Sequence, residues 1–83
     1  MSGEPLLTLE EVVVVCAVSR EWVRERVTEG LLPAAPEGRF TAIAVKRVRR
    51  MLAIERDFDA APELAALMAD LLEELDALRA RLG

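Results

Sequence analysis

Residues 8–32 read TLEEVVVVCAVSREWVRERVTEGLL and contain the start signals of two short helices. Thr8 and Glu11 have capping-box spacing, in which the hydroxyl accepts from one free amide and the carboxylate accepts from another. Ser19 offers a second N-cap, and Gly30 suits the left-handed residue that closes a helix. The stretch therefore predicts two capped helices joined by a tight turn, which is a helix-turn-helix.

The first of these helices contains a run of four valines, Val12 to Val15. β-Branched residues favour a strand, and here only the caps and the short length favour a helix. Four adjacent positions span every face of a helix, so at least one valine is expected to be partly exposed, and Val14 is the best candidate. An exposed Val14 would belong either to a binding surface or to ordinary apolar surface. In the second helix, Trp22 is expected in the core.

The chain beyond Gly30 changes from turn to long helix. Residues 33–40 are rich in turn formers and predict a small wing anchored by Phe40. A helix capped by Thr41 is expected from about residue 42 to residue 57, and Pro62 fits the first turn of a last helix. The basic side chains expected to be exposed on the helix after Thr41 are Lys46, Arg47, Arg49, Arg50 and Arg56. The predicted division is a flexible lead at 1–7, a helix-turn-helix domain at 8–58 and a C-terminal helix at 59–83.

The last helix carries apolar residues at alternating spacings of four and three, which is the a/d pattern of a coiled coil. These seam residues are Leu64, Met68, Leu71, Leu75, Leu78 and Leu82. About three heptads are marginal for an isolated coiled coil, so this helix is also expected to pack on its own domain. The seam predicts a homodimer.

Four acidic residues of the same helix are expected at outward positions, namely Glu63, Asp70, Glu73 and Asp76. Such a face is either a solvated surface or a binding site for a basic partner. The charge of the whole chain, −4, is unevenly distributed. Residues 39–58 carry six Lys/Arg against two acids, whereas residues 59–83 carry two against six.

Composition narrows the class of protein. A chain of 83 residues with 53% apolar residues is expected to form one folded domain. One cysteine and no histidine exclude the usual zinc sites and Cys-His or Ser-His catalysis, and the acidic pairs look like solvated helix faces. We therefore expect no enzyme activity, no metal and no cofactor. No stretch reads as a signal peptide or membrane helix, so a cytoplasmic protein without a membrane partner is expected.

The order of these elements resembles the N-terminal domain of MerR-type regulators. Ser19, Arg24, Gly30 with Leu31, and the run Gly38-Arg39-Phe40 fall where that family has its turn serine, recognition-helix arginine, glycine-leucine close and wing. The family usually carries two aromatic residues after the arginine, and this chain has Glu25 and Arg26 there. This difference removes two phosphate-contacting side chains and adds a carboxylate, which disfavours DNA binding.

A narrower resemblance covers about residues 7 to 82. The residues that carry it are Leu9, Val12 or Val13, Ser19, Val23, Val27, Gly30-Leu31, Phe40, Val45 to Arg47, Asp59, Pro62, Leu64, Leu67, Met68 and Asp70. Together they look like the chaperone-modulator (CbpM-like) branch of the MerR superfamily. The resemblance implies an all-α, MerR-like winged helix-turn-helix with a long C-terminal coiled-coil-type helix.

The same resemblance implies a function. Members of that branch bind the J-domain of a DnaJ/CbpA-type co-chaperone and inhibit its co-chaperone activity and its association with DNA. J-domains present a basic helix, to which an acidic helix face is the charge complement. The expected partner-binding residues are thus Glu63, Asp70, Glu73 and Asp76, with Val14 as an apolar candidate.

Two alternatives belong to other classes of protein. A MerR-type DNA-binding transcriptional regulator would place four arginines on phosphates, namely Arg20, Arg24, Arg26 and Arg39. A purely structural dimerisation module would use only the leucine seam. Binding to duplex DNA and binding to a J-domain, measured separately, distinguish the first alternative from the chaperone modulator.

Overall fold

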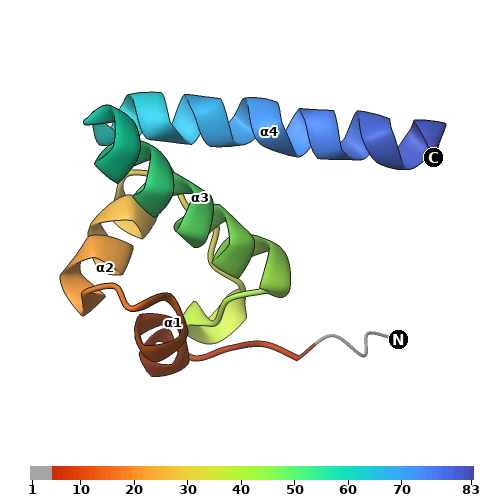
Figure 1. Cartoon of the computed structure of the whole chain (residues 1–83). Helices are drawn as coiled ribbons and strands as arrows, with labels where there is room; N and C mark the ends of the chain where they lie inside the picture. The colour runs from red at the N-terminus through yellow and green to blue at the C-terminus, as the bar shows by residue number, and fades with distance from the viewer. Residues whose placement is uncertain (1–4) are drawn as a thin grey trace. The chain divides into compact units, whose positions relative to one another are not determined.

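The computed structural model describes residues 5–83, and this range contains four α-helices (Figure 1). The helices are α1 (Leu9–Cys16), α2 (Arg20–Thr28), α3 (Ala42–Phe58) and α4 (Pro62–Leu82). Residues 5–83 contain two isolated β-bridges and no β-strand. The all-α class is therefore confirmed, and the four helices lie where the sequence predicts them.

The chain divides into two compact units, Met1–Arg49 and Arg50–Gly83. The first unit contains α1, α2, the connecting segment and the beginning of α3. The second contains the end of α3 and all of α4. The sequence places its domain boundary after residue 58, at the break before Pro62, whereas the boundary between the compact units falls inside the continuous helix α3.

Both short helices begin at side-chain caps. The Thr8 hydroxyl accepts from the Glu11 N–H at 3.2 Å, and the Glu11 carboxylate accepts from the Thr8 N–H at 2.8 Å. The Ser19 hydroxyl accepts from the Trp22 N–H at 3.0 Å and starts α2. These bonds satisfy amides that no helix carbonyl reaches, so they determine where α1 and α2 begin.

The valine run is helical. α1 ends at Cys16, and Ala17 follows with a left-handed φ of 54°. Val12 is fully buried, whereas Val14 is 79% exposed, which confirms the prediction for Val14. The caps at the two ends of α1 outweigh the strand preference of its β-branched side chains.

The core of the first unit is built mainly from branched apolar side chains. It contains Val12, Val18, Val23, Leu32, Phe40, Ala44 and Val48. α1 and α2 pack against each other within this unit. Trp22, predicted in the core, is only half-buried, and the guanidinium of Arg26 lies over its ring at 4.6 Å from the centroid.

Residues 33–40, the predicted wing, connect α2 to α3. Phe40 is buried, as expected of an anchor, and it exchanges two backbone hydrogen bonds of 2.8 Å with Leu7. Leu7, the last residue of the predicted flexible lead, is thereby held beside the backbone of Phe40. Residues 1–4 of that lead lie outside the described residues.

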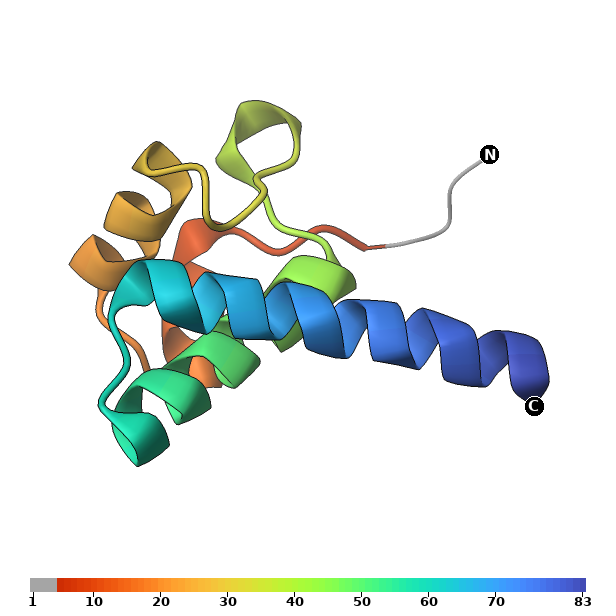
Figure 2. The same cartoon turned by 90° about the horizontal axis from the view of Figure 1, so that it is seen from above.

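The chain reverses direction between Ala35 and Arg39. The Ala35 N–H donates to the Arg39 carbonyl at 2.7 Å, and the 3₁₀ turn Pro36–Gly38 lies between them. Glu37 and Gly38 have φ values of 64° and 70°, a left-handed conformation that favours glycine. Figure 2 shows the turn as the yellow-green loop between α2 and α3.

α3 begins at its predicted cap, since the Thr41 hydroxyl accepts from the Ala44 N–H at 3.1 Å. Arg49 and Arg56 are exposed, as expected, but the prediction for Arg47 is wrong. Arg47 is 8% exposed, and its Nε donates to the Leu31 carbonyl at 2.8 Å. The guanidinium satisfies a carbonyl just beyond the end of α2, which a count of charged residues does not reveal.

α3 and α4 are separated by three residues. Asp59 follows α3 with a left-handed φ of 52°, and Pro62 occupies the first turn of α4. Proline suits that position because its missing N–H would have no helical acceptor there.

Candidate protein-binding surface

α4 separates its alanines from its leucines. Ala65, Ala66 and Ala69 are buried. With about 3.6 residues per helical turn, the predicted seam lies on the other side of the helix. The exposed leucines, called the leucine row below, are Leu64, Leu67, Leu71, Leu72, Leu75, Leu78 and Leu82.

The leucine row is strongly exposed for apolar side chains. Leu71 is 58% exposed, Leu78 is 50% exposed and Leu82 is 90% exposed, while Met68 of the seam is half-buried. Fully burying one leucine stabilises a protein by about 1.5–3 kcal/mol, and contiguous exposed apolar patches mark interaction sites. Within the described residues, α4 therefore buries its alanines and leaves the leucine row exposed.

The four predicted acidic residues do not share one outward face. Glu63 and Asp70 are exposed, whereas Glu73 and Asp76 are half-buried and lie on the side of the buried alanines. Asp76 Oδ2 lies 2.7 Å from Nη2 of Arg50. Arg50 was predicted to be exposed, but its side chain is only 21% exposed, so that prediction is wrong. The outward prediction is therefore wrong for Glu73 and Asp76.

Glu74 was not among the predicted partner-binding residues. It is exposed and lies on the same edge of α4 as Glu63 and Asp70. Its spacing of four from Asp70 was the signal that could have found it. We call these three residues the acidic edge. A shallow hollow of about 250 Å³ lies beside it, lined by Glu74, Ala77, Leu78 and Arg81.

Two of the four arginines of the DNA-binding alternative are engaged within the chain. Arg20 Nη2 forms an ion pair of 2.7 Å with Glu10. Arg26 is only 7% exposed, stacks on Trp22 and places Nη1 3.4 Å from a Glu25 oxygen. A buried guanidinium is poorly placed to contact phosphate.

The other two arginines, Arg24 and Arg39, are exposed. Within residues 5–83, the guanidinium of neither forms a hydrogen bond or ion pair. Arg24 belongs to α2, and Arg39 follows the 3₁₀ turn Pro36–Gly38, so both of these exposed cations are in the first unit. Val14 is also exposed in this unit, whereas the acidic edge is in the second unit.

The Asp57 carboxylate accepts from Arg56 Nε at 2.9 Å, and this hydrogen bond, with the charge of Asp57, raises the pKa of Arg56. Across the described residues, no group of three or more His, Cys, Asp or Glu side chains is arranged to hold a metal ion.

No helix within residues 5–83 has the length and apolarity needed to cross a bilayer. No protein-family model matches the chain, and no curated protein or solved structure gives a significant match.

Proposed function

We propose that this chain is a cytoplasmic chaperone modulator that binds the J-domain of a DnaJ/CbpA-type co-chaperone and inhibits its co-chaperone and DNA-binding activities. The observation that carries the proposal is the acidic edge of α4, because Glu63, Asp70 and Glu74 are exposed beside the leucine row. The basic helix of a J-domain would find three carboxylates there, at the edge of the leucine row. The partner's identity, and the MerR-like winged helix-turn-helix architecture, come from the resemblance to the CbpM-like branch.

The engaged arginines also favour a protein partner over DNA. Non-specific DNA affinity depends on cations that neutralise phosphates. Arg20 is paired with Glu10, and Arg26 is buried on Trp22, so the cations available to a duplex are fewer than the sequence suggests.

The proposal includes a homodimer formed through the seam. The exposure of Leu71, Leu75 and Leu78 supports it, since a second copy of α4 would bury these side chains from both chains. Interfaces between copies are commonly isologous, with the same patch used on both partners. The acidic edge borders the row and would remain at the rim of such an interface.

The decisive experiment measures binding of the wild-type chain to the J-domain of its cognate co-chaperone by stopped-flow and equilibrium titration. Reversing Asp70 and Glu74 to Lys is expected to slow association by about tenfold at low salt and to flatten its salt dependence, because rim charges act mainly on the on-rate. The matched control reverses Glu21 and Glu29, exposed acids of the first unit, and changes the net charge equally.

The outcomes test separate parts of the proposal. No detectable J-domain binding by the wild type at tens of micromolar would reject the assignment. Equal slowing by the control would show that net charge, and not the acidic edge, steers the partner. A Val14→Ser variant with unchanged affinity would remove Val14 from the binding surface.

The exposure of Arg24 and Arg39 favours a second candidate function, that of a MerR-type DNA-binding regulator. We expect only weak duplex binding without useful sequence preference, since a working regulator binds its site at roughly 10⁻⁸ M or tighter. Nanomolar, sequence-selective binding at physiological salt, lost in Arg24→Ala, would replace the chaperone proposal with this one.

A further inference from the structure

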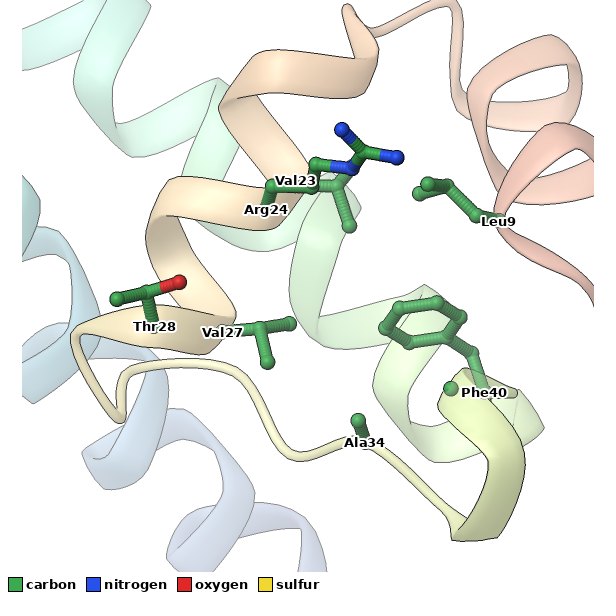
Figure 3. A pocket seen from close by; sticks show the side chains of 8 residues that line it. Leu9, Val23, Arg24, Val27, Thr28, Ala34 and Phe40 are labelled. Carbon is green, nitrogen blue, oxygen red and sulfur yellow. The ribbon is translucent and has the colours of Figure 1, made fainter.

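A recess in the first unit and the hollow on α4 differ in the charges that line them. The recess has a volume of about 300 Å³, and Figure 3 shows Leu9 and Phe40 pointing toward it. Among the described residues that line it, only Arg24 is charged. The hollow on α4, of about 250 Å³, is lined by Glu74 and Arg81 and lies beside the leucine row. Opposite charges beside an exposed apolar row can determine how a second helix is oriented on it.

The heptad pattern of α4 identifies the residues that flank the seam. The six seam residues occupy positions a and d, so the flanking positions are e and g. The flanking residues at g are Leu67, Glu74 and Arg81. Those at e are Ala65, Leu72 and Arg79. Ala65 is buried within the chain, whereas the other five are exposed.

Along both flanks, a leucine is followed one heptad later by a charged residue. At g, Leu67 precedes Glu74, and at e, Leu72 precedes Arg79. The two leucines are 54% and 36% exposed. Within residues 5–83, the side chains of Glu74 and Arg79 form no hydrogen bond or ion pair. Both flanks are therefore open to contacts across a dimer.

A parallel pair of α4 helices matches these flanks. In a parallel coiled coil, a g residue faces the e residue of the following heptad in the second copy. Leu67 then faces Leu72 of the second copy, and Glu74 faces Arg79 of the second copy. Because the interface is isologous, each contact occurs on both sides of the seam. Apolar side chains thus meet each other, and opposite charges meet each other.

An antiparallel pair buries the same seam but mismatches the flanks. In that arrangement g faces g and e faces e, and the seam spacing places Leu64 opposite Leu82 of the second copy. Glu74 then faces Glu74 of the second copy, and Leu67 faces Arg81. Leu72 alone still meets an apolar partner. Like charges across an interface repel, so the flanks disfavour this orientation.

The hollow on α4 lies where the parallel pair would place an arginine. Side chains of a helix lean toward its own N-terminus. In a parallel pair, the alkyl stem of Arg79 from the second copy would therefore cross Ala77 and Leu78, which line the hollow. Its guanidinium would reach Glu74 and point away from Arg81, the lining residue nearer the C-terminus. Arginine stems pack on apolar surface in this way while the charged head stays in water.

We propose that the seam joins two copies of this chain in parallel, with Glu74 paired to Arg79 and Leu67 packed on Leu72 across the interface. This inference rests on the homodimer of the proposed function and adds its orientation and these four interface residues. The ion pairs select the orientation more than they strengthen the dimer, because exposed pairs contribute little to affinity.

Disulfide trapping of the full-length chain in glutathione buffer tests the orientation. Cys16→Ser removes the native thiol, and Ala61→Cys or Gly83→Cys then places a single exposed cysteine at one end of α4. In an equal mixture of the two variants, a parallel dimer holds like ends together. Homodisulfides are expected to exceed the mixed disulfide by about tenfold, since tethering raises the effective concentration of the facing thiols. An excess of the mixed disulfide would show an antiparallel dimer.

Sedimentation equilibrium of charge variants tests the flank contacts. Glu74→Arg is expected to raise the dimer dissociation constant by about four- to thirtyfold, because two attractive contacts between exposed charges become two repulsive ones. Adding Arg79→Glu to this variant is expected to restore the constant to within about twofold of the wild type. The matched control is Glu63→Arg, which changes the net charge equally at an exposed position of α4 outside e and g. It is expected to change the constant by less than about twofold.

The outcomes separate this inference from the proposed function. A wild type that is monomeric at tens of micromolar would overturn the orientation and the proposed homodimer together. A dimer trapped as the mixed disulfide would overturn the orientation alone, as would a Glu74→Arg dimer that Arg79→Glu does not rescue. Binding of the J-domain is measured separately, and neither of these two results bears on it.

Discussion

The first compact unit and helix α4 differ in which of their apolar residues they bury. The first unit buries large side chains, with Val12, Val23 and Leu32 at most 2% exposed, and shows charge to the solvent. On α4 the buried residues are Ala65, Ala66 and Ala69, while the leucine row is exposed. A face of alanines releases less free energy on burial than a face of leucines, so α4 retains most of its capacity for apolar association after the chain has folded.

The structure therefore distinguishes apolar residues that are expected to stabilise the fold from apolar residues that are expected to bind another chain. In the first unit, apolar residues specify the fold of one chain. On α4 the leucine row is exposed, and its loss is expected to affect assembly rather than folding. Substitutions in the two units should therefore have different consequences for the same change in chemistry.

The largest expected effect comes from placing charge in the leucine row. The double substitution Leu71→Asp, Leu75→Asp would bury unpaired carboxylates in the proposed dimer. Burying such charges costs several kcal/mol of association free energy, so the dimer should dissociate to monomers. Sedimentation equilibrium at tens of micromolar measures this. The matched control, Ala77→Asp with Ala80→Asp, places the same charges at exposed positions of α4 outside the row and should leave the dimer intact. A monomeric wild type would reject the dimer.

A core truncation in the first unit should reduce stability instead. Leu32→Ala, at a position 2% exposed, is expected to lower the free energy of unfolding by about 2–5 kcal/mol. Leu82→Ala removes the same atoms at a position 90% exposed and should change it by less than about 0.5 kcal/mol. Urea denaturation followed by circular dichroism compares the two variants. Equal losses would contradict the contrast between the units.

Removing the buried arginine of α3 should have an intermediate effect. Arg47→Ala leaves the Leu31 carbonyl without its donor, and an unsatisfied buried polar group costs about 1–3 kcal/mol. Arg49→Ala, at an exposed neighbouring position, is expected to be nearly neutral. The same denaturation experiment measures both, and a neutral Arg47→Ala would mean that water replaces the guanidinium.

The smallest effect is expected for the ion pair of Arg20 with Glu10. Both side chains are more than half exposed, so their coupling in a double-mutant cycle should be about 0.2–1 kcal/mol and should decrease with added salt. Variants with Ala at either or both positions complete the cycle. A coupling that does not change with salt would show that the pair is less exposed in solution than its geometry indicates.

Local signals in the sequence predicted the helices well. The caps at Thr8, Ser19 and Thr41 and the proline at Pro62 act through neighbouring residues, so their effect is readable without knowledge of the fold. The left-handed residue Ala17 was not predicted, because alanine carries no signal for that conformation.

Side-chain environments that depend on tertiary contacts were predicted less well. The charges of Arg26, Arg47 and Asp76 suggested that their side chains are exposed to solvent. Instead, Arg26 stacks on an aromatic ring, Arg47 donates to a backbone carbonyl, and Asp76 forms an ion pair with an arginine of another helix. Helical periodicity found the seam of α4, yet it did not reveal that the alanines are the side buried within the chain. An a/d pattern identifies an apolar face and leaves open which molecule covers it.

The left-handed residues that follow α1 and α3 have a consequence for the entropy of the unfolded chain. Ala17 and Asp59 have positive φ values although neither is glycine. This left-handed conformation costs about 1–2 kcal/mol per residue in the folded state. Glycine would remove the strain, but it would also give the unfolded backbone more conformations to lose. The present residues limit the conformations that each connection samples before the helices form. The short links after α1 and α3 therefore behave as stiff spacers, and we expect them to tolerate a change of residue better than a change of length.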